Sequence, residues 1–238
     1  MHPNFVNGDR QADNAMSRIQ PTRVVDREDE SDSSEHMPRP RRTHAERREE
    51  AEKRMLDAAV RIVAERGIDY LTLAECGEAA GYSRGLAAHY FGSKDALVAA
   101  IANHIVSNYV QRSRGGSRGK KGLEGFLNAV DFYIESGRNR VLELRAFNAV
   151  LGAAPTHRDL ADAIAAVTRD SVQSLADGLE ICRKQGSVRA DIDPRSQATM
   201  ILAMMRGVMA QWLLDPEGVD LDKIKAELLS SLRRSLAP

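Results

Sequence analysis

The sequence predicts an all-α fold, and two observations lead to this prediction. From Ala45 to the end of the 238-residue chain, apolar residues recur three and four positions apart, which is the spacing of one helix face. Few runs of alternating β-branched residues compete with this pattern, so no sheet is expected. Glycine and proline residues separate the periodic segments, where they end one helix and allow the next to begin.

The composition is that of a soluble globular protein, with 42% hydrophobic and 29% charged residues. No run of about 18 apolar residues is present, and the first residues lack the apolar segment of a secretory signal. Two cysteines are too few for a disulfide scaffold, which favours a reducing compartment. We therefore expect a cytoplasmic protein that has no membrane partner.

The formal net charge of zero is the sum of unlike parts. Residues 1–36 carry −4 and residues 122–238 carry −2, whereas residues 37–95 carry +1 and residues 96–121 carry +5. The middle of the chain is therefore a basic block between acidic sequences. Such asymmetry indicates a region that faces nucleic acid, although solvated helix faces and one basic loop would explain it equally well.

The first 44 residues lack any apolar period and are rich in Asp, Glu, Ser, Arg and Pro. Too little apolar surface is available to offset the entropy of ordering them, so we expect a disordered leader. It ends in the basic arm Pro38–Arg42, which would either lie in a minor groove of DNA or remain a solvated tail. Met37 is an alternative start of the chain.

Two short helices joined by a tight turn are expected after a longer first helix. The first helix begins near Ala45, and Gly67 ends it. Thr72 is placed to cap the second helix, and Ser83 is placed to cap the third. Gly81 lies between these two helices and can adopt a positive φ. This is helix-turn-helix geometry, in which the second short helix enters the major groove of DNA.

The remaining residues are expected to form further helices, each with its own apolar stripe. Ser93 is placed to cap the first of these helices, which leads to a basic, Gly-rich loop over Arg112–Gly122. The next helix is closed by Gly137, and the one after it ends before Pro155. The last three are expected over His157–Gln185, from Pro194 onward and over Leu221–Leu236.

A specific combination of residues runs from Leu71 to Leu97: Thr72, Ala80-Gly81-Tyr82-Ser83, Arg84-Gly85, His89-Tyr90-Phe91 and Ser93-Lys94-Asp95. This window resembles the DNA-binding head of the TetR family of bacterial transcriptional repressors, and the resemblance covers about residues 45–105. It implies three parts: the leader 1–44, a three-helix helix-turn-helix domain over 45–92, and an all-helical ligand-binding and dimerisation domain over 93–238.

The resemblance also implies which residues contact DNA. They are Thr72, Tyr82, Ser83, Arg84, Gly85, Leu86, His89, Tyr90 and Lys94. Arg84 would read a guanine through two hydrogen bonds or bind a phosphate. Leu86 would touch a thymine methyl group or pack against the preceding helix. Lys94 would bind phosphate at the N-terminus of its helix.

Three positions depart from the usual pattern of the family. Ala88 stands where an aromatic residue is common, and Ala87 replaces a larger aliphatic residue. Cys76-Gly77 replaces a more typical Ile-Ala pair, and the glycine should loosen its helix by up to about 1 kcal/mol. These changes leave open a protein that binds a ligand but whose DNA-binding head is weakened.

The resemblance implies a ligand pocket and a dimer interface in the second half of the chain. The pocket candidates are His104, Asn108, Phe126, Val130, Tyr133, Arg145, Phe147, Val150, Met204 and Trp212. The interface candidates are Ile201, Met205, Val208, Met209, Ile224, Leu228 and Leu232, which would form a four-helix interface with a symmetry mate. In the alternative, both stripes pack inside one monomer.

We therefore expect a TetR-like transcriptional regulator, a repressor that binds a palindromic operator in double-stranded DNA as a homodimer and is released by a small-molecule effector. The six histidines are scattered without metal-ligand spacing, and neither a CxxC pair nor a GxSxG nucleophile motif occurs. No enzymatic activity, metal or cofactor is expected.

Overall fold

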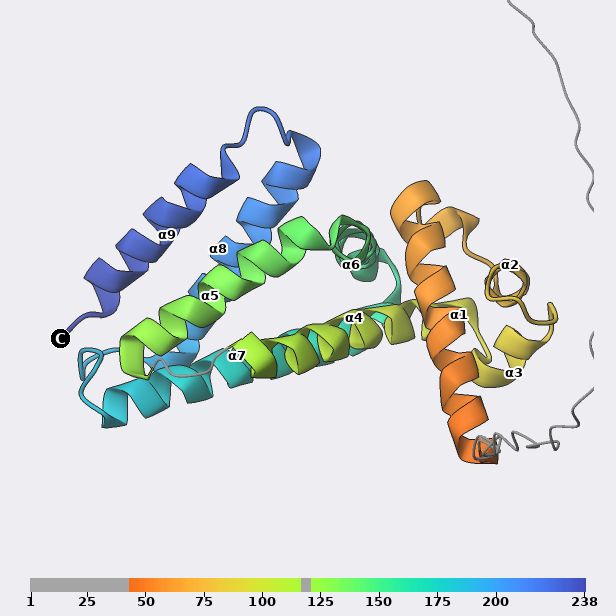
Figure 1. Cartoon of the computed structure of the whole chain (residues 1–238), viewed down its shortest axis with the longest axis horizontal. Helices are drawn as coiled ribbons and strands as arrows, with labels where there is room; N and C mark the ends of the chain where they lie inside the picture. Colours follow the sequence, from red (N-terminus) through yellow and green to blue (C-terminus); the bar gives the residue numbers. More distant parts are fainter. Residues whose placement is uncertain (1–42, 117–120) are drawn as a thin grey trace, which may run out of the picture. The chain divides into compact units, whose positions relative to one another are not determined.

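The computed structural model describes residues 43–116 and 121–238, and within these ranges the chain forms helices and turns without a strand (Figure 1). The prediction of an all-α fold is confirmed. The predicted leader, including its basic arm, lies outside the described residues apart from Thr43 and His44. The α-helices are α1 His44–Arg66, α2 Leu73–Ala79, α3 Leu86–Phe91, α4 Lys94–Gly116, α5 Gly122–Asn139, α6 Val141–Ala153, α7 Arg158–Lys184, α8 Pro194–Leu214 and α9 Leu221–Leu236, with short 3-10 turns η1 Ile68–Tyr70 and η2 Ala154–Thr156.

Side-chain caps explain where α1 and α2 begin. Thr43 and Glu46 form a capping box at the start of α1, in which Thr43 Oγ1 accepts from the Glu46 amide at 3.2 Å. Thr72 caps α2 as predicted, because its Oγ1 accepts from the Glu75 amide at 3.1 Å. Gly67 ends α1 with a φ of +90°, a conformation that favours glycine.

The two serine caps have different outcomes. Ser93 caps α4 as predicted, since its Oγ accepts from the Ala96 amide at 3.1 Å. Ser83 does not cap α3, because that helix begins only at Leu86 and has no side-chain cap. The prediction for Ser83 was wrong because the turn takes up two more residues than the sequence pattern indicated.

Two predicted helix ends lie elsewhere in the structure. Gly137 does not close α5, which continues to Asn139. A Cβ at Gly137 would lie 2.8 Å from Met209 Cε, so this glycine allows close packing of α5 against α8. The basic loop expected from Arg112 begins later, since α4 extends to Gly116 and Arg112 is helical.

The head shares its apolar core with the helices that follow it. Buried residues of α1, α3 and α4 form one cluster with Phe147 and Val150 of α6 and Leu160 of α7. In agreement with this, α1 packs against α6 as well as against α2 and α4 (Figure 1). A second cluster joins α5, α7, α8 and α9. Within the described residues, no helix combines the length and apolar composition needed to span a membrane.

The stripes predicted to form a dimer interface pack mainly inside the monomer. Five of the seven candidates are no more than 8% exposed, namely Ile201, Met205, Met209, Leu228 and Leu232. Val208 is half-buried beside Met209, and only Ile224, at 40%, is exposed. For the five buried residues the structure agrees with the alternative in which the stripes pack inside one monomer, because α8 and α9 cover these stripes against helices of their own chain.

Gly77 allows α2 to approach the turn that follows it closely. The Tyr82 amide donates to the Gly77 carbonyl at 2.9 Å, and a Cβ on Gly77 would lie 2.6 Å from the Ser83 carbonyl oxygen. We expect Gly77→Ala to lower the free energy of unfolding by about 1–3 kcal/mol, because the turn must shift. This net loss is expected despite the roughly 1 kcal/mol that alanine adds in helix propensity. Urea denaturation followed by circular dichroism measures it.

Gly152→Ala in α6 is the matched control. A Cβ at Gly152 would meet no atom within 4 Å, so this substitution should leave stability unchanged or raise it slightly. A Gly77→Ala variant as stable as the wild type would contradict the role assigned to the close approach.

Candidate functional site

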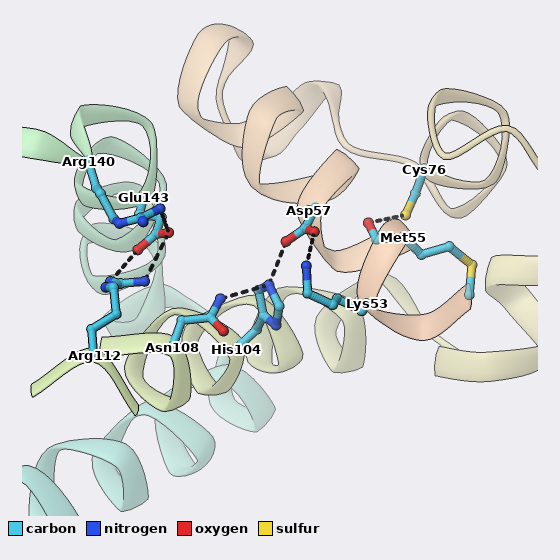
Figure 2. Close-up of polar contacts among 9 residues, drawn as sticks. All are labelled: Lys53, Met55, Asp57, Cys76, His104, Asn108, Arg112, Arg140 and Glu143. Carbon is cyan, nitrogen blue, oxygen red and sulfur yellow. Dashed lines mark hydrogen bonds and ion pairs between the residues drawn. The ribbon is translucent and has the colours of Figure 1, made fainter. Parts of the chain in front are cut away.

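The helix-turn-helix is formed by α2, the turn around Gly81 and α3. Gly81 has a φ of +81°, which confirms that the turn uses the left-handed region. Ala87 of α3 is completely buried in the core of the head. Cys76 of α2 is also buried, and its Sγ donates to the Met55 carbonyl at 3.3 Å (Figure 2). Burial raises the pKa of the Cys76 thiol to about 11, which keeps it protonated.

The residues predicted to contact DNA divide into an exposed and a half-buried group. Thr72, Ser83, Arg84, Gly85 and His89 are exposed. Tyr82, Leu86, Tyr90 and Lys94 are half-buried.

Arg84 is the most accessible charge of this surface. Its side chain is 74% exposed and lies 3.3 Å from Glu78 in an ion pair that water screens. The guanidinium can therefore exchange this partner for another anion at little cost. Leu86 packs against the core of the head, which agrees with the packing alternative for that residue.

Two of the half-buried residues, Tyr90 near the end of α3 and Lys94 at the start of α4, contact neighbouring segments. The Tyr90 hydroxyl donates to the Arg48 carbonyl at 3.4 Å, and the Arg48 guanidinium lies 5.6 Å from the centre of the Tyr90 ring. Lys94 Nζ donates to the Asp69 carbonyl at 3.3 Å. Sequence reasoning missed Arg48, although its position among exposed basic residues near the start of α1 was a usable signal.

A cavity of about 750 Å³ lies among α4, α5, α6, α7 and α8. Three of the predicted pocket residues line it, namely Phe126, Tyr133 and Phe147. His104 and Asn108 line a second cavity of about 450 Å³ instead. Five further candidates line neither cavity: Val130 and Val150 are buried in the cores, Trp212 packs beside Met209, and Arg145 and Met204 are exposed.

Sequence reasoning missed several residues that give the large cavity its character. Tyr109 lies edge-on to Tyr133 with ring centres 5.6 Å apart, and burial raises the pKa of Tyr109 to about 12. Burial also raises the pKa of Tyr133. Both phenols are therefore neutral hydrogen-bonding groups near neutral pH. The missed lining residues that carry charge include Arg112, Arg140, Glu143 and Arg206.

Three polar side chains of α4, His104, Asn108 and Arg112, lie four residues apart along one face (Figure 2). His104 Nε2 lies 2.8 Å from Oδ1 of Asp57 in α1 and 3.1 Å from Asn108 Nδ2. At the other end, Arg112 Nη2 donates to Glu143 Oε2 at 2.8 Å. This row of side chains therefore contacts the first helix of the head at one end and the wall of the large cavity at the other.

Asp57 receives hydrogen bonds from both α1 and α4. Lys53 Nζ donates to Asp57 Oδ2 at 2.8 Å, opposite the contact with His104 (Figure 2). Partial burial raises the pKa of Asp57, but the hydrogen bonds and charges of Lys53 and His104 outweigh it together. The pKa of Asp57 therefore lies below its ordinary value of 3.8.

Two family models match the chain, one in each half. The first, described as "Bacterial regulatory proteins, tetR family", matches residues 55–101. The second, described as "BetI-type transcriptional repressor, C-terminal", matches residues 124–237. Together the two models cover more than half of the chain.

Curated relatives include two transcriptional regulators. The regulator BetI of Brucella anthropi is 32% identical over 96 residues, a match that spans 40% of this chain and 42% of that protein. The match thus covers less than half of the relative. The regulator TtgR of Pseudomonas putida is 25% identical over 197 residues, which span 76% of this chain and 88% of that protein.

Solved structures with the same fold are also regulators. A candidate TetR-family transcriptional regulator from Rhodococcus sp. matches with a TM-score of 0.73 at 23% identity, covering 79% of this chain and 100% of that one. A candidate transcriptional regulator from Saccharomonospora viridis in complex with choline has a TM-score of 0.68 at 20% identity, covering 80% and 99%. The complex of SmeT with triclosan has a TM-score of 0.66 at 24% identity, covering 79% and 92%. At these identities the likeness shows the fold.

Asp57→Asn tests the polar contact between α1 and α4. Because the pKa of Asp57 is lowered in the folded state, its stabilisation is complete above pH 3.8 and is lost as the pH falls through the folded-state pKa. The Asp57 side chain is 46% exposed, so we expect a contribution below about 1 kcal/mol. Melting temperatures of the wild type and the variant should therefore converge as the pH is lowered from about 6 to about 3.

The same substitution in a background that carries Lys53→Met and His104→Leu is the control. With both donors removed, the difference in melting temperature between the proteins with Asp57 and with Asn at this position should no longer shrink as the pH is lowered. A wild-type advantage that stays constant down to about pH 3 would show that these hydrogen bonds do not stabilise the carboxylate.

Proposed function

The chain belongs to the TetR family of bacterial regulatory proteins, and we propose that within this family it is a repressor that a small molecule releases from DNA. The family consists of transcriptional regulators, so the chain is a DNA-binding regulator and not an enzyme. The observation that carries the proposal is the position of α4. Its start packs in the core of the head, and Ile105, Tyr109 and Arg112 farther along line the large cavity.

The proposed DNA contacts follow from the exposure of α3 and its neighbours. Arg84, at the turn before α3, would reach a guanine edge in the major groove. Thr72, Ser83, His89 and Lys94 would bind phosphates, while Tyr82, Gly85, Leu86 and Tyr90 shape and support this surface. Ala87 is completely buried in the core of the head, which supports an intact DNA-binding unit over a weakened one.

The proposed dimer uses the outward faces of α8 and α9 instead of their buried stripes. Met200, Met204 and Leu214 of α8 are 49%, 40% and 87% exposed, and Ile224 of α9 is 40% exposed. Gly207 lies on α8 between two of these residues, and a Cβ there would meet no atom within 4 Å. Exposed apolar side chains around an open glycine favour close contact with a second copy of the same helix. Two heads could then bind two half-sites of a palindromic operator.

The cavity supports the proposed effector. A volume of about 750 Å³ lies within the range of small-molecule sites. Two proteins of the same fold were solved with small molecules, one with choline and one with triclosan. A ligand in the cavity contacts α4 directly, so it would favour the position of α4 that suits the ligand and shift the population away from the DNA-binding arrangement.

Arg84→Ala and Lys94→Ala separate base reading from phosphate binding. Affinities are measured for DNA from upstream of the chain's own gene and for a random duplex of the same length. We expect Lys94→Ala to weaken binding to both duplexes. It should also reduce, by about one, the slope of log affinity against log salt concentration. Arg84→Ala should in addition remove about 1–3 kcal/mol of preference for the upstream sequence.

Arg183→Ala is the control, because Arg183 is an exposed arginine at the end of α7 that pairs with Glu180. It should leave affinity and preference unchanged. Equal losses on both duplexes for Arg84→Ala would contradict its base-reading role. A wild type without any preference for the upstream DNA would contradict the proposed repressor.

The double variant Met204→Asp, Ile224→Asp tests the dimer surface. The wild type should sediment at twice the chain mass of 26.2 kDa, and the variant should sediment as a monomer because the charges cannot be buried in an interface. Leu142→Asp is the matched control, since Leu142 of α6 is also 40% exposed. A wild-type monomer, or a double variant that remains a dimer, would contradict the proposed interface.

A further inference from the structure

One basic side chain in the wall of the large cavity lacks an acidic partner. Arg206 Nη1 donates to Thr168 Oγ1 at 3.1 Å, and the guanidinium lies 5.4 Å from the centre of the Phe147 ring. Its Nε is buried without a hydrogen-bond partner. Among the side chains that the structure describes, no carboxylate lies within 4.0 Å of this guanidinium. Arg206 as a whole is half-buried, and an unpaired cation that is partly removed from water favours pairing with an anion.

The other neighbours of Arg206 do not supply that anion. Burial lowers the pKa of Arg206, and the nearby Tyr133 phenol opposes this change only in part. The pKa of Tyr133 is itself raised by burial, so the phenol stays neutral. Since an arginine side chain remains protonated in proteins, the cavity wall holds a permanent positive charge beside two aromatic rings.

The remaining charges of the cavity leave this positive charge uncompensated. Glu143 accepts from Arg112 at 2.8 Å and from Arg140 at 3.3 Å, so its carboxylate is shared between two arginines (Figure 2). Asp170, the other carboxylate of the wall, is exposed on α7 and therefore lies where water screens it. Lys121 adds a further basic group to the wall. The lining thus has more basic than acidic groups.

The rest of the wall is apolar and suits the body of an organic ligand. Phe126, Phe147, Leu202 and Met205 are buried residues that line the same cavity as Arg206. Apolar walls with a few oriented polar groups are typical of sites that bury most of a small ligand. A ligand for this cavity therefore needs an extended apolar part and one group that matches a guanidinium.

We propose that the large cavity binds an amphipathic organic anion, whose carboxylate pairs with Arg206 and whose apolar body lies against the aromatic wall. A carboxylate can accept charge-assisted hydrogen bonds from a guanidinium that no acidic side chain of the wall has taken up. A quaternary ammonium group, by contrast, would meet a like charge. This inference deepens the proposed function, because it names the chemical class of the effector. It rests on the proposed function only for the step from ligand binding to DNA release.

Three probes with the same ten-carbon chain test the charge preference: decanoate, decan-1-ol and decyltrimethylammonium. Isothermal titration calorimetry on the full chain measures their binding below the concentrations at which they form micelles. We expect decanoate to bind at least about tenfold more tightly than either other probe, because a charge-assisted hydrogen bond is available only to the carboxylate. Equal affinities, tighter binding of the ammonium probe or no binding of decanoate would overturn the inference.

Two variants of Arg206 attribute this preference to one side chain. Arg206→Met keeps the length but removes the charge, and should lower decanoate affinity about tenfold while decan-1-ol binds as before or better. Arg206→Lys keeps the charge and should retain part of the preference. Arg195→Met is the control, because Arg195 is an exposed arginine of α8 that does not line the cavity. Undiminished decanoate binding by Arg206→Met, with native circular dichroism, would refute the pairing.

DNA binding in the presence of decanoate separates this inference from the proposed function. Arg206-dependent binding of decanoate supports the anion site whether or not the upstream DNA is released. Binding without release contradicts the proposed effector response alone. If the protein prefers its upstream DNA through Arg84 but binds no decanoate, the proposed regulatory function is supported and the anion site is refuted.

Discussion

The packing of α4 into two parts of the structure is the constraint on which the rest depends. Its first turns bury Leu97 and Ile101 completely in the core of the head. About one and two turns after Ile101, Ile105 and Tyr109 line the large cavity. Backbone hydrogen bonds join each turn to the next, so the parts of α4 in the head and at the cavity belong to one continuous helix. Close-packed side chains at both ends allow discrete repacking and little continuous deformation.

Local signals in the sequence were sufficient to predict much of the head. The cap formed by Thr72 and the positive φ of Gly81 depend on a few neighbouring residues, and both were found where they were predicted. Ser83 failed as a cap because the length of a turn depends on how the two helices pack. Gly77 illustrates the same limit: its low helix propensity is visible in the sequence, whereas its contact with the Ser83 carbonyl exists only in the folded chain.

The second half of the chain could be predicted as helices but not as sites. Periodicity shows which face of α8 is apolar, yet it does not show whether the same chain or a second copy covers that face. The stripe with Met205 and Met209 is covered by its own monomer, which left Met200 and Met204 as the exposed apolar residues. Phe126, Tyr133 and Phe147 were predicted to line the pocket and do so, but most of the other lining residues were missed for a related reason. Tyr109 and Arg206 come to line one cavity only after five helices have packed, and no local pattern distinguishes them from surface residues.

An effector changes DNA binding only if it binds two arrangements of the head with different affinities. Tyr109 of α4 and Arg206 of α8 contribute to the same cavity, so a displacement of α4 changes the spacing between an aromatic wall and a fixed cation. A ligand that contacts both favours one spacing. A tenfold change in DNA affinity requires about 1.4 kcal/mol of coupling, and a charge-assisted hydrogen bond contributes about 1.5–3 kcal/mol. One ion pair that the ligand makes in only one arrangement would therefore be enough to change DNA affinity tenfold. The ligand would not need to contact the DNA-binding surface.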